Sequence, residues 1–305
     1  MRRRRALLGA LLVLVLAATA FATARHPLEH RSRPLPAKRN AHVPALRTIS
    51  WPQQGQAALA LGDGRPGASP HQQPAPIASL AKLMTAYLTL ERYPLSGAQS
   101  GFTITVTAAQ AQAAAQAAAQ DESFVAVRAG EQLTERQLLE ALLIPSGNNI
   151  ARMLADLLAG SETRFLEEMN AEARALGMDH TIYTDPSGFD PGTVSTAADQ
   201  LRVLRRAMRF PAFRQIVPLA GVTLPVAGAV TNFNPLIAEG FAGKTGSDSA
   251  AGGCLAFFTR VTVGGRRLAA AGVVMGQGEG SDTKAILAAA GEAAKQMVDS
   301  VGAGA

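Results

Sequence analysis

A serine and a lysine stand one helical turn apart in the apolar segment PIASLAKLMTAYLTL, residues 76–90. Lys82 is the one charged residue of that segment, and Ser79 precedes it by three positions. Positions i and i+3 of a helix share a face, so the Ser79 hydroxyl would lie within reach of the Lys82 amine. Burial disfavours charged lysine, and a neutral Lys82 could accept the serine proton. The pair could act as nucleophile and base, although a lysine reaching to water beside an unrelated serine has the same pattern.

A second polar group stands where a helical pattern breaks. In PSGNN, residues 145–149, the proline and glycine predict a tight turn between two helical segments. Ser146 and Asn148 on such a turn could enter a cleft. A plain connection between helices would have the same composition, so the turn alone does not indicate a site.

A third group, GKTG at residues 243–246, stands at the start of a strand-like run. Its glycines would let a substrate backbone approach closely. Lys244 supplies a positive charge and Thr245 a hydroxyl. A glycine-rich strand end is the alternative interpretation of this segment.

The three groups occur together, in the order Ser-x-x-Lys, Ser-x-Asn, Lys-Thr-Gly. Ser146 follows Ser79 by 67 residues and Lys244 follows Ser146 by 98, which leaves room for a helical subdomain between the walls of a cleft. Each motif is common by itself, but chance agreement of all three in this order is small. We therefore interpret them as parts of one site, in the order that serine acyl-transfer enzymes use.

The elements that must position these groups are helices in the middle of the chain and strands at both ends. Periodicity and capping residues predict helices around Ser79, over 130–144, up to Gly160, over 161–177, over 195–208 and over 281–301. The Ala/Gln-rich run 104–120 is compatible with a helix or with a solvated connector.

Strand-like segments flank this helical middle, which spans about residues 78–210. QAALAL at 56–61 and a short stretch after the GDG turn form the first pair. AGVTLPV, CLAFFTRVTV and RRLAAAGVVMG follow later, the last two joined by a hairpin turn at Gly264–Gly265. The pattern predicts an α+β fold, an antiparallel sheet flanked by helices with an inserted all-helical subdomain.

The N-terminal segments differ in composition from the rest of the chain. Residues 1–24 combine four arginines, an apolar stretch and Ala-x-Ala steps, which is typical of a secretory signal peptide; an uncleaved membrane anchor is the alternative. Residues 25–47 form a basic, Pro-rich stretch that we interpret as a disordered tether. We expect the folded domain over 48–305, working outside the cytoplasm.

The positive charge of the chain lies almost entirely in that N-terminal part. Residues 1–48 hold 10 of the 29 Lys and Arg residues and one of the 23 acidic ones. The remainder carries 19 basic and 22 acidic side chains, a net charge of −3. This balance excludes nucleic-acid binding by the folded domain.

No cofactor or metal is indicated by the sequence. The single Cys254 cannot form an internal disulfide, and its place in the strand-like GGCLAFF favours a structural role. The five histidines, three of them in the tether, show no metal-ligand spacing. We find no phosphate-binding loop.

The segments around the three motifs resemble the low-molecular-weight D-alanyl-D-alanine carboxypeptidases, a family of penicillin-binding proteins. The resemblance covers about residues 48–300 and includes PIASLAKLMTAY, LLEALLIPSGNNIA, FLEEMNAEARALGM, TDPSGFD, STAADQL and GFAGKTGS. It implies a β-lactamase/transpeptidase-like fold, peptidoglycan stem peptides as substrate and β-lactams as inhibitors. It implies no cofactor.

The same resemblance implies a role for each motif residue. Ser79 would be the acylated nucleophile, with Lys82 as its general base and Ser146 as a proton relay. Asn148 would orient the substrate amide. Lys244 and Thr245 would bind the substrate carboxylate beside Gly246, and the backbone N–H groups of Ser79 and Ser247 would form an oxyanion hole.

This chain departs from the family pattern at three places. The second motif continues with Asn149-Ile150 where Asp-Ala is usual, which we interpret as packing behind the cleft wall. Phe189 stands where leucine is commoner. The stretch SDSAAGG after the third motif is smaller and more polar than usual, which puts substrate preference in doubt more than catalysis.

The expected reaction is acyl transfer, in which Ser79 attacks the penultimate D-Ala carbonyl and terminal D-Ala leaves. A class A β-lactamase is the nearest alternative, but the Glu-x-x-Leu-Asn stretch that would activate a deacylating water is absent. A DD-endopeptidase would use the same residues. A penicillin-binding sensor that never turns over its acyl-enzyme is a third, non-enzymatic alternative.

Overall fold

The computed structural model describes residues 49–119 and 122–303, which fall within one compact unit, residues 43–305. The expected signal peptide and tether, residues 1–24 and 25–47, lie outside the described residues. In the part of the chain that the structure describes, no helix is both long and apolar enough to cross a membrane.

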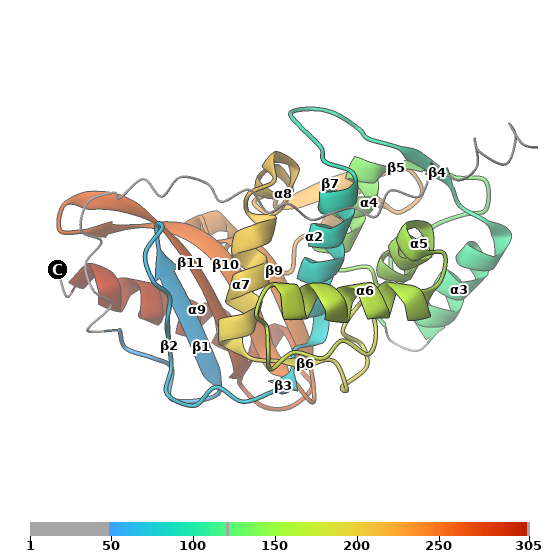
Figure 1. Cartoon of the computed structure of the whole chain (residues 1–305). Helices are drawn as coiled ribbons and strands as arrows, with labels where there is room; N and C mark the ends of the chain where they lie inside the picture. Colours follow the sequence, from blue (N-terminus) through green and yellow to red (C-terminus); the bar gives the residue numbers. More distant parts are fainter. Residues whose placement is uncertain (1–48, 120–121, 304–305) are drawn as a thin grey trace, which may run out of the picture. The chain divides into compact units, whose positions relative to one another are not determined.

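A five-stranded antiparallel sheet is built from the two ends of the described chain (Figure 1). Its order is β2-β1-β11-β10-β9, and β10 and β11 pair along their length across the Gly264–Gly265 turn. The expected strand 56–61 and the expected hairpin are thereby confirmed. The strand bounds are β1 Gln56–Leu61, β2 Gly67–Ala68, β9 Ala242–Asp248, β10 Gly252–Val263 and β11 Arg266–Gln277.

Strand β1 contributes side chains to both faces of the sheet, with leucines on one face and alanines on the other. In β1, Leu59 and Leu61 belong to a core cluster shared with α9, Thr283–Ala303, whereas Ala58 and Ala60 face the other way, into the core shared with α7, Ala197–Ala207. This alternation follows from the two-residue period of a strand. Figure 1 shows α7 and α9 on opposite faces of the sheet. The alanines let α7 pack closely against β1 and β11.

The middle of the chain is mainly helical, as expected, and α7 lies between its helices and the sheet (Figure 1). Gly160 ends α5 with a left-handed backbone, and Ser161 and Thr196 cap α6 and α7. The helices are α2 Lys82–Arg92, α3 Ala108–Ala119, α4 Glu135–Leu143, α5 Asn148–Ala159, α6 Glu162–Ala175, α7 and α8 Pro211–Ile216. The Ala/Gln run, for which two structures were open, is helical as α3.

The expected all-helical subdomain needs a correction, because it also contains strands. β4, Thr103–Thr105, pairs with β5, Gln132–Thr134, and β3, Ala75–Pro76, pairs with β6, Val194–Ser195. The remaining short elements are β7 Gly221–Leu224, β8 Gly228–Thr231 and the 3-10 helices η1 Ala78–Ala81 and η2 Ile237–Glu239.

The predicted helix over 130–144 was wrong at its N-terminal end. Thr134 caps α4 through a reciprocal capping box with Gln137, so the helix begins only at Glu135. The preceding residues pair with β4 instead, and Leu133 lies opposite Ile104. Leu133 is buried in the strand, and its spacing also fits the apolar stripe of a helix, so the sequence pattern could not separate the two structures.

Candidate active site

Ser79 occupies the short 3-10 helix η1, and Lys82 is the first residue of α2. The expected α-helix around Ser79 is thus a 3-10 turn followed by an α-helix, and the two residues still lie one turn apart. From Ile77 to Tyr87 every side chain is buried except Ser79, which is partly exposed. Ala78 has a left-handed backbone with φ of 44°, a conformation that costs a non-glycine residue about 1–2 kcal/mol. The fold therefore exposes the serine hydroxyl on a strained turn of an otherwise buried element.

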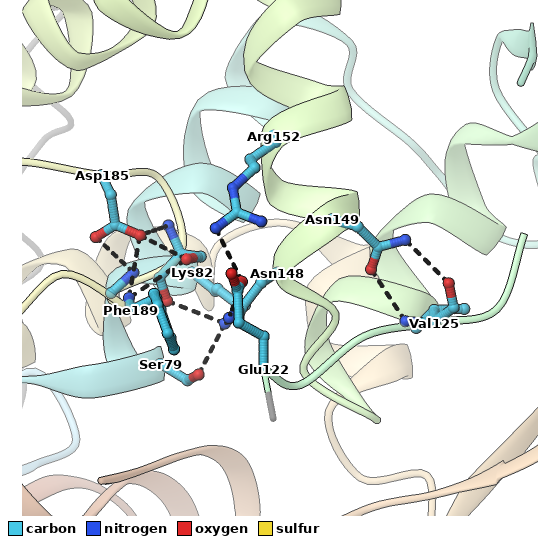
Figure 2. A network of polar contacts seen from close by, with 11 residues as sticks. Ser79, Lys82, Glu122, Val125, Asn148, Asn149, Arg152, Asp185 and Phe189 are labelled. Carbon is cyan, nitrogen blue, oxygen red and sulfur yellow. Dashed lines mark hydrogen bonds and ion pairs between the residues drawn. The ribbon is translucent and has the colours of Figure 1, made fainter. Parts of the chain in front are cut away.

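The amine of Lys82 is buried and has three oxygen neighbours (Figure 2). Its Nζ lies 2.7 Å from Oγ of Ser79, 2.7 Å from Oδ1 of Asn148 and 2.9 Å from the carbonyl oxygen of Ser187. Burial lowers the pKa of Lys82 well below its ordinary value, and the positive charge of Lys244 lowers the pKa further. The one charged residue of the apolar segment is thus an amine whose lowered pKa favours the neutral form, in contact with a serine hydroxyl.

Ser146 and Lys244 form a second hydroxyl–amine pair. The Lys244 amine donates to Oγ of Ser146 at 2.8 Å and to the carbonyl oxygen of Thr245 at 2.8 Å. Burial lowers the pKa of Lys244 to about 7. Ser146 itself has a left-handed backbone, with φ of 64°, on the turn between α4 and α5. The structure therefore brings together two motifs that stand 98 residues apart.

Strand β9 runs directly past the turn that carries Ser79. A Cβ on Gly246 would lie 2.7 Å from the carbonyl oxygen of Ile77 and 3.2 Å from the backbone nitrogen of Ser79. No side chain fits in that space, which explains the glycine of the third motif. Thr245 is buried and Ser247 partly exposed on the same strand. All eight residues predicted from the sequence thus lie on three adjoining elements, η1–α2, the α4–α5 turn with the start of α5, and β9.

Asn148 uses both ends of its carboxamide within the protein. Its Oδ1 faces Lys82, and its Nδ2 donates to Oε2 of Glu122 at 3.0 Å. Glu122 also accepts from Arg152 at 2.8 Å. Glu122 and Arg152 were not predicted from the sequence. Arg152 lies four residues after Asn148, one helical turn along α5, and this spacing indicates that the two side chains share a face of the helix. Glu122 follows a low-complexity run, and no local pattern indicates its role.

A loop ordered by Asp185 supplies the third neighbour of Lys82. The Asp185 carboxylate accepts from Oγ of Ser187 at 2.5 Å and from Oγ1 of Thr193 at 2.8 Å. It also accepts from the backbone N–H groups of residues 187, 188 and 189 (Figure 2). This network holds the Ser187 carbonyl against Lys82. No role was predicted for TDPSGFD: Asp-Pro-Ser-Gly is typical of a turn, but no local pattern indicates that this turn contacts Lys82.

We expect Gly188→Ala to disorder this loop. Gly188 has φ of 79°, and a Cβ there would lie 1.8 Å from the carbonyl oxygen of Ala78, next to the serine. The strained backbone and the overlap together should cost about 2–4 kcal/mol of unfolding free energy. The Ser187 carbonyl would also leave Lys82. Thermal unfolding and the rate of covalent modification of Ser79 measure the two effects.

Gly160→Ala is the matched control for that experiment. Gly160 has φ of 78°, and a Cβ there would meet no atom within 4 Å. It should cost about 1–2 kcal/mol and leave the reactivity of Ser79 unchanged. If Gly188→Ala behaved like Gly160→Ala, the close approach of the loop to Ala78 would not be important.

The departures from the family pattern have different structural settings. Asn149 is buried and makes two hydrogen bonds to the backbone of Val125, with its Oδ1 accepting at 3.0 Å and its Nδ2 donating at 2.9 Å. It thus lies behind the wall, as expected, but it ties a loop rather than only filling space. Phe189 is exposed.

Cys254 is fully buried and burial raises its pKa to about 12, in agreement with a structural role.

Within the described ranges, 49–119 and 122–303, no group of three or more His, Cys, Asp or Glu side chains is arranged so that it could hold a metal ion.

Comparison with known proteins identifies the family. The sequence profile described as D-alanyl-D-alanine carboxypeptidase, peptidase S11, matches residues 68–278, more than half of the chain. This chain belongs to that family. The three motifs and the elements that carry them all lie within the matched range.

Two curated relatives and one solved structure show how far the similarity extends. The chain is 34% identical over 202 residues to the D-alanyl-D-alanine carboxypeptidase DacB2 of Mycobacterium tuberculosis, covering 63% of this chain and 64% of the relative. It is 34% identical over 141 residues to the D-alanyl-D-alanine endopeptidase of Pseudomonas aeruginosa, covering 46% and 42%. The chain thus spans less than two thirds of either relative.

A mutant of the Streptomyces K15 DD-transpeptidase superimposes with a TM-score of 0.69 at 25% identity, covering 82% of this chain and 98% of that one. The mixed fold, an antiparallel sheet with helices on both faces and a mainly helical insertion, is therefore the transpeptidase-like fold.

Proposed function

We propose that this protein is a serine-type D-Ala-D-Ala carboxypeptidase that removes the terminal D-Ala from peptidoglycan stem peptides through an acyl-enzyme on Ser79. The observation that carries the proposal is the contact of 2.7 Å between the buried Lys82 amine and Oγ of Ser79. Family membership supports the substrate class.

In the first step, Lys82 acts as the general base. A neutral amine has two N–H bonds and one lone pair. The oxygens of Asn148 and Ser187 accept the two N–H bonds, which directs the lone pair at Oγ of Ser79. Oγ attacks the carbonyl carbon of the penultimate D-Ala while its proton moves to Lys82.

In the second step, the C–N bond breaks and the leaving amine of D-Ala takes up a proton. Ser146 gives its own hydrogen to this amine and regains one from Lys82; its hydroxyl accepts from Lys244, which leaves that hydrogen available for donation. The ester on Ser79 is then hydrolysed by water, with Lys82 again neutral and able to accept a proton. Free D-Ala and the shortened peptide are the products.

The remaining motif residues recognise the substrate. Lys244 and Thr245 bind the terminal carboxylate, and Asn148 orients the substrate amide with the hydrogen-bonding capacity left on its carboxamide. The backbone N–H groups of Ser79 and Ser247 stabilise the oxyanion. The absence of a side chain at Gly246 supports this role, because it lets β9 run close to the backbone of Ser79. β-Lactams, which present a strained amide near a carboxylate, acylate the same serine.

DD-endopeptidase activity is the second candidate, favoured by the similarity to an endopeptidase from Pseudomonas aeruginosa. The experiment that separates the candidates offers the purified protein a pentapeptide stem and a cross-linked muropeptide dimer. Release of free D-Ala from the pentapeptide supports the carboxypeptidase, and cleavage of the dimer supports the endopeptidase. Stable penicillin labelling with neither product would contradict both candidates and indicate a sensor that does not turn over its acyl-enzyme. Rapid hydrolysis of penicillin would indicate a β-lactamase instead.

We also propose a location and a domain organisation. Residues 1–24 act as an export signal, or as the membrane anchor if they are not cleaved, and residues 48–305 form the catalytic domain. Because its substrate would be peptidoglycan, we expect this domain to act outside the cytoplasm.

A further inference from the structure

The loop after α3 is fastened to the start of α5 at three points. The backbone N–H of Asn148 donates to the carbonyl oxygen of Ser123 at 2.7 Å. The side chain of the next residue, Asn149, makes the two hydrogen bonds to Val125 described above (Figure 2). A low-complexity helix is thereby followed by a loop whose position relative to the second motif is closely determined.

This loop delivers the carboxylate of Glu122 to the catalytic network. The residue is 7% exposed, and its Oε2 accepts from Nδ2 of Asn148 at 3.0 Å and from Arg152 at 2.8 Å. Figure 2 shows Glu122 close to Asn148 and to the guanidinium of Arg152. A chain of contacts therefore runs from Glu122 through the Asn148 carboxamide to the Lys82 amine.

The carboxamide of Asn148 can be turned by 180° without a change of shape, which would exchange its oxygen and its NH₂ group. A turned carboxamide would point an N–H of its NH₂ group at Lys82, where it would compete with Ser79 for the lone pair of the neutral amine and could no longer accept from that amine. A carboxylate accepts hydrogen bonds and donates none. Glu122 therefore stabilises the orientation that faces the oxygen of Asn148 to Lys82.

We propose that Glu122 is a positioning residue for acylation of Ser79, acting through the orientation of Asn148. The inference rests on the proposed function, since it assumes that Lys82 serves Ser79. It adds a residue outside the three motifs, on a loop that carries none of them.

The charges around Lys82 provide a signature that a merely structural role would not have. Burial dominates its lowered pKa; Lys244 from β9 and Arg152 from α5 lower the pKa further, while Asp185 and Glu122 from two loops raise it. Removing Glu122 alone leaves Arg152 unopposed, so the acidic limb of the acylation rate should move to lower pH. Removing Arg152 alone should move that limb to higher pH.

The test compares Glu122→Gln, Glu122→Asp and Arg152→Gln with the native protein, using the acylation rate by a fluorescent penicillin as a function of pH. Glu122→Gln offers Asn148 both an oxygen and an NH₂ group, so the orientation is no longer selected. Loss of a hydrogen bond to a charged group should slow acylation about 10- to 100-fold. Glu122→Asp keeps a carboxylate and should retain more of the rate.

The matched control is Glu168→Gln, which breaks the ion pair between Arg92 and Glu168, 2.9 Å long and formed by α2 and α6. It should leave the acylation rate and its pH profile unchanged. Thermal unfolding of each variant separates a change of rate from a loss of folded protein.

The proposal is overturned if Glu122→Gln acylates within twofold of the native rate with an unmoved pH profile, or if Glu122→Asp is as slow as Glu122→Gln. It is also overturned if only deacylation slows, because Glu122 would then activate water instead. A native protein that penicillin does not label would contradict the proposed function itself and the inference with it. Native labelling with unaffected variants would contradict the inference alone.

Discussion

Ser79→Ala is expected to abolish both covalent labelling by penicillin and release of D-Ala from a pentapeptide. The hydroxyl is the group that forms the acyl-enzyme, and it is the partly exposed oxygen that faces the Lys82 amine. Without it the reaction has no covalent route, and we expect a loss of at least about 10³-fold. Fluorescent penicillin on a denaturing gel and a D-Ala assay measure the two losses.

The control for that variant is Ser100→Ala, which changes an exposed serine. Its labelling and D-Ala release should equal those of the native protein. Full labelling of Ser79→Ala would show that another residue is the nucleophile.

Lys82→Met is expected to slow acylation by about 10³- to 10⁴-fold, the upper range for loss of a general base. Methionine fills similar space but offers no lone pair basic enough to accept the serine proton. Lys82→Arg should be as slow, because a guanidinium stays charged when buried and cannot act as a base. Stopped-flow or quenched labelling by penicillin measures the rate of acylation.

Lys82→Met should not destabilise the protein. The pKa of Lys82 is lower in the folded protein than in the unfolded chain. Between its folded pKa and the unfolded pKa of about 10.4, the unfolded chain therefore binds more protons, and this lysine lowers stability; below both pKa values the full cost remains. Lys82→Met removes that cost, although it leaves the oxygens of Asn148 and Ser187 without their donor. If Lys82→Met unfolds at or above the native temperature and still acylates slowly, the loss of rate is due to catalysis and not to folding. An acylation rate near the native one would show that Lys82 is not the general base.

Local patterns were sufficient for much of the fold. The strand at 56–61, the Gly264–Gly265 hairpin and the helix end at Gly160 each depend on neighbouring residues, and each was predicted at its place. The residues before Glu135 were assigned to a helix because Leu133 fits the apolar period of either structure. Its pairing with Ile104 is a contact between segments some 30 residues apart, which periodicity does not report.

The residues of the site also fall into those that the sequence could predict and those that it could not. The motif residues could be named from their order along the chain, and the structure places them on adjoining elements. Ser187 and Glu122 could not be predicted in this way, because each acts over a long separation: Ser187 is 105 residues from Lys82, and Glu122 is 26 from Asn148. A carboxylate after an Ala/Gln run and a carbonyl in a turn have no signature until folding brings them to the lysine.

The pH dependence of Ser79 acylation by penicillin, between pH 5 and pH 10, tests the central claim that a neutral Lys82 accepts the serine proton. Because its pKa is lowered well below the ordinary value, the rate should stop rising with pH well before pH 10. Above pH 7 it should fall, because the pKa of Lys244 is about 7 and the charge that binds the carboxylate is lost. A rate that instead rose about tenfold per pH unit up to pH 10 would show a lysine of ordinary pKa and contradict the account.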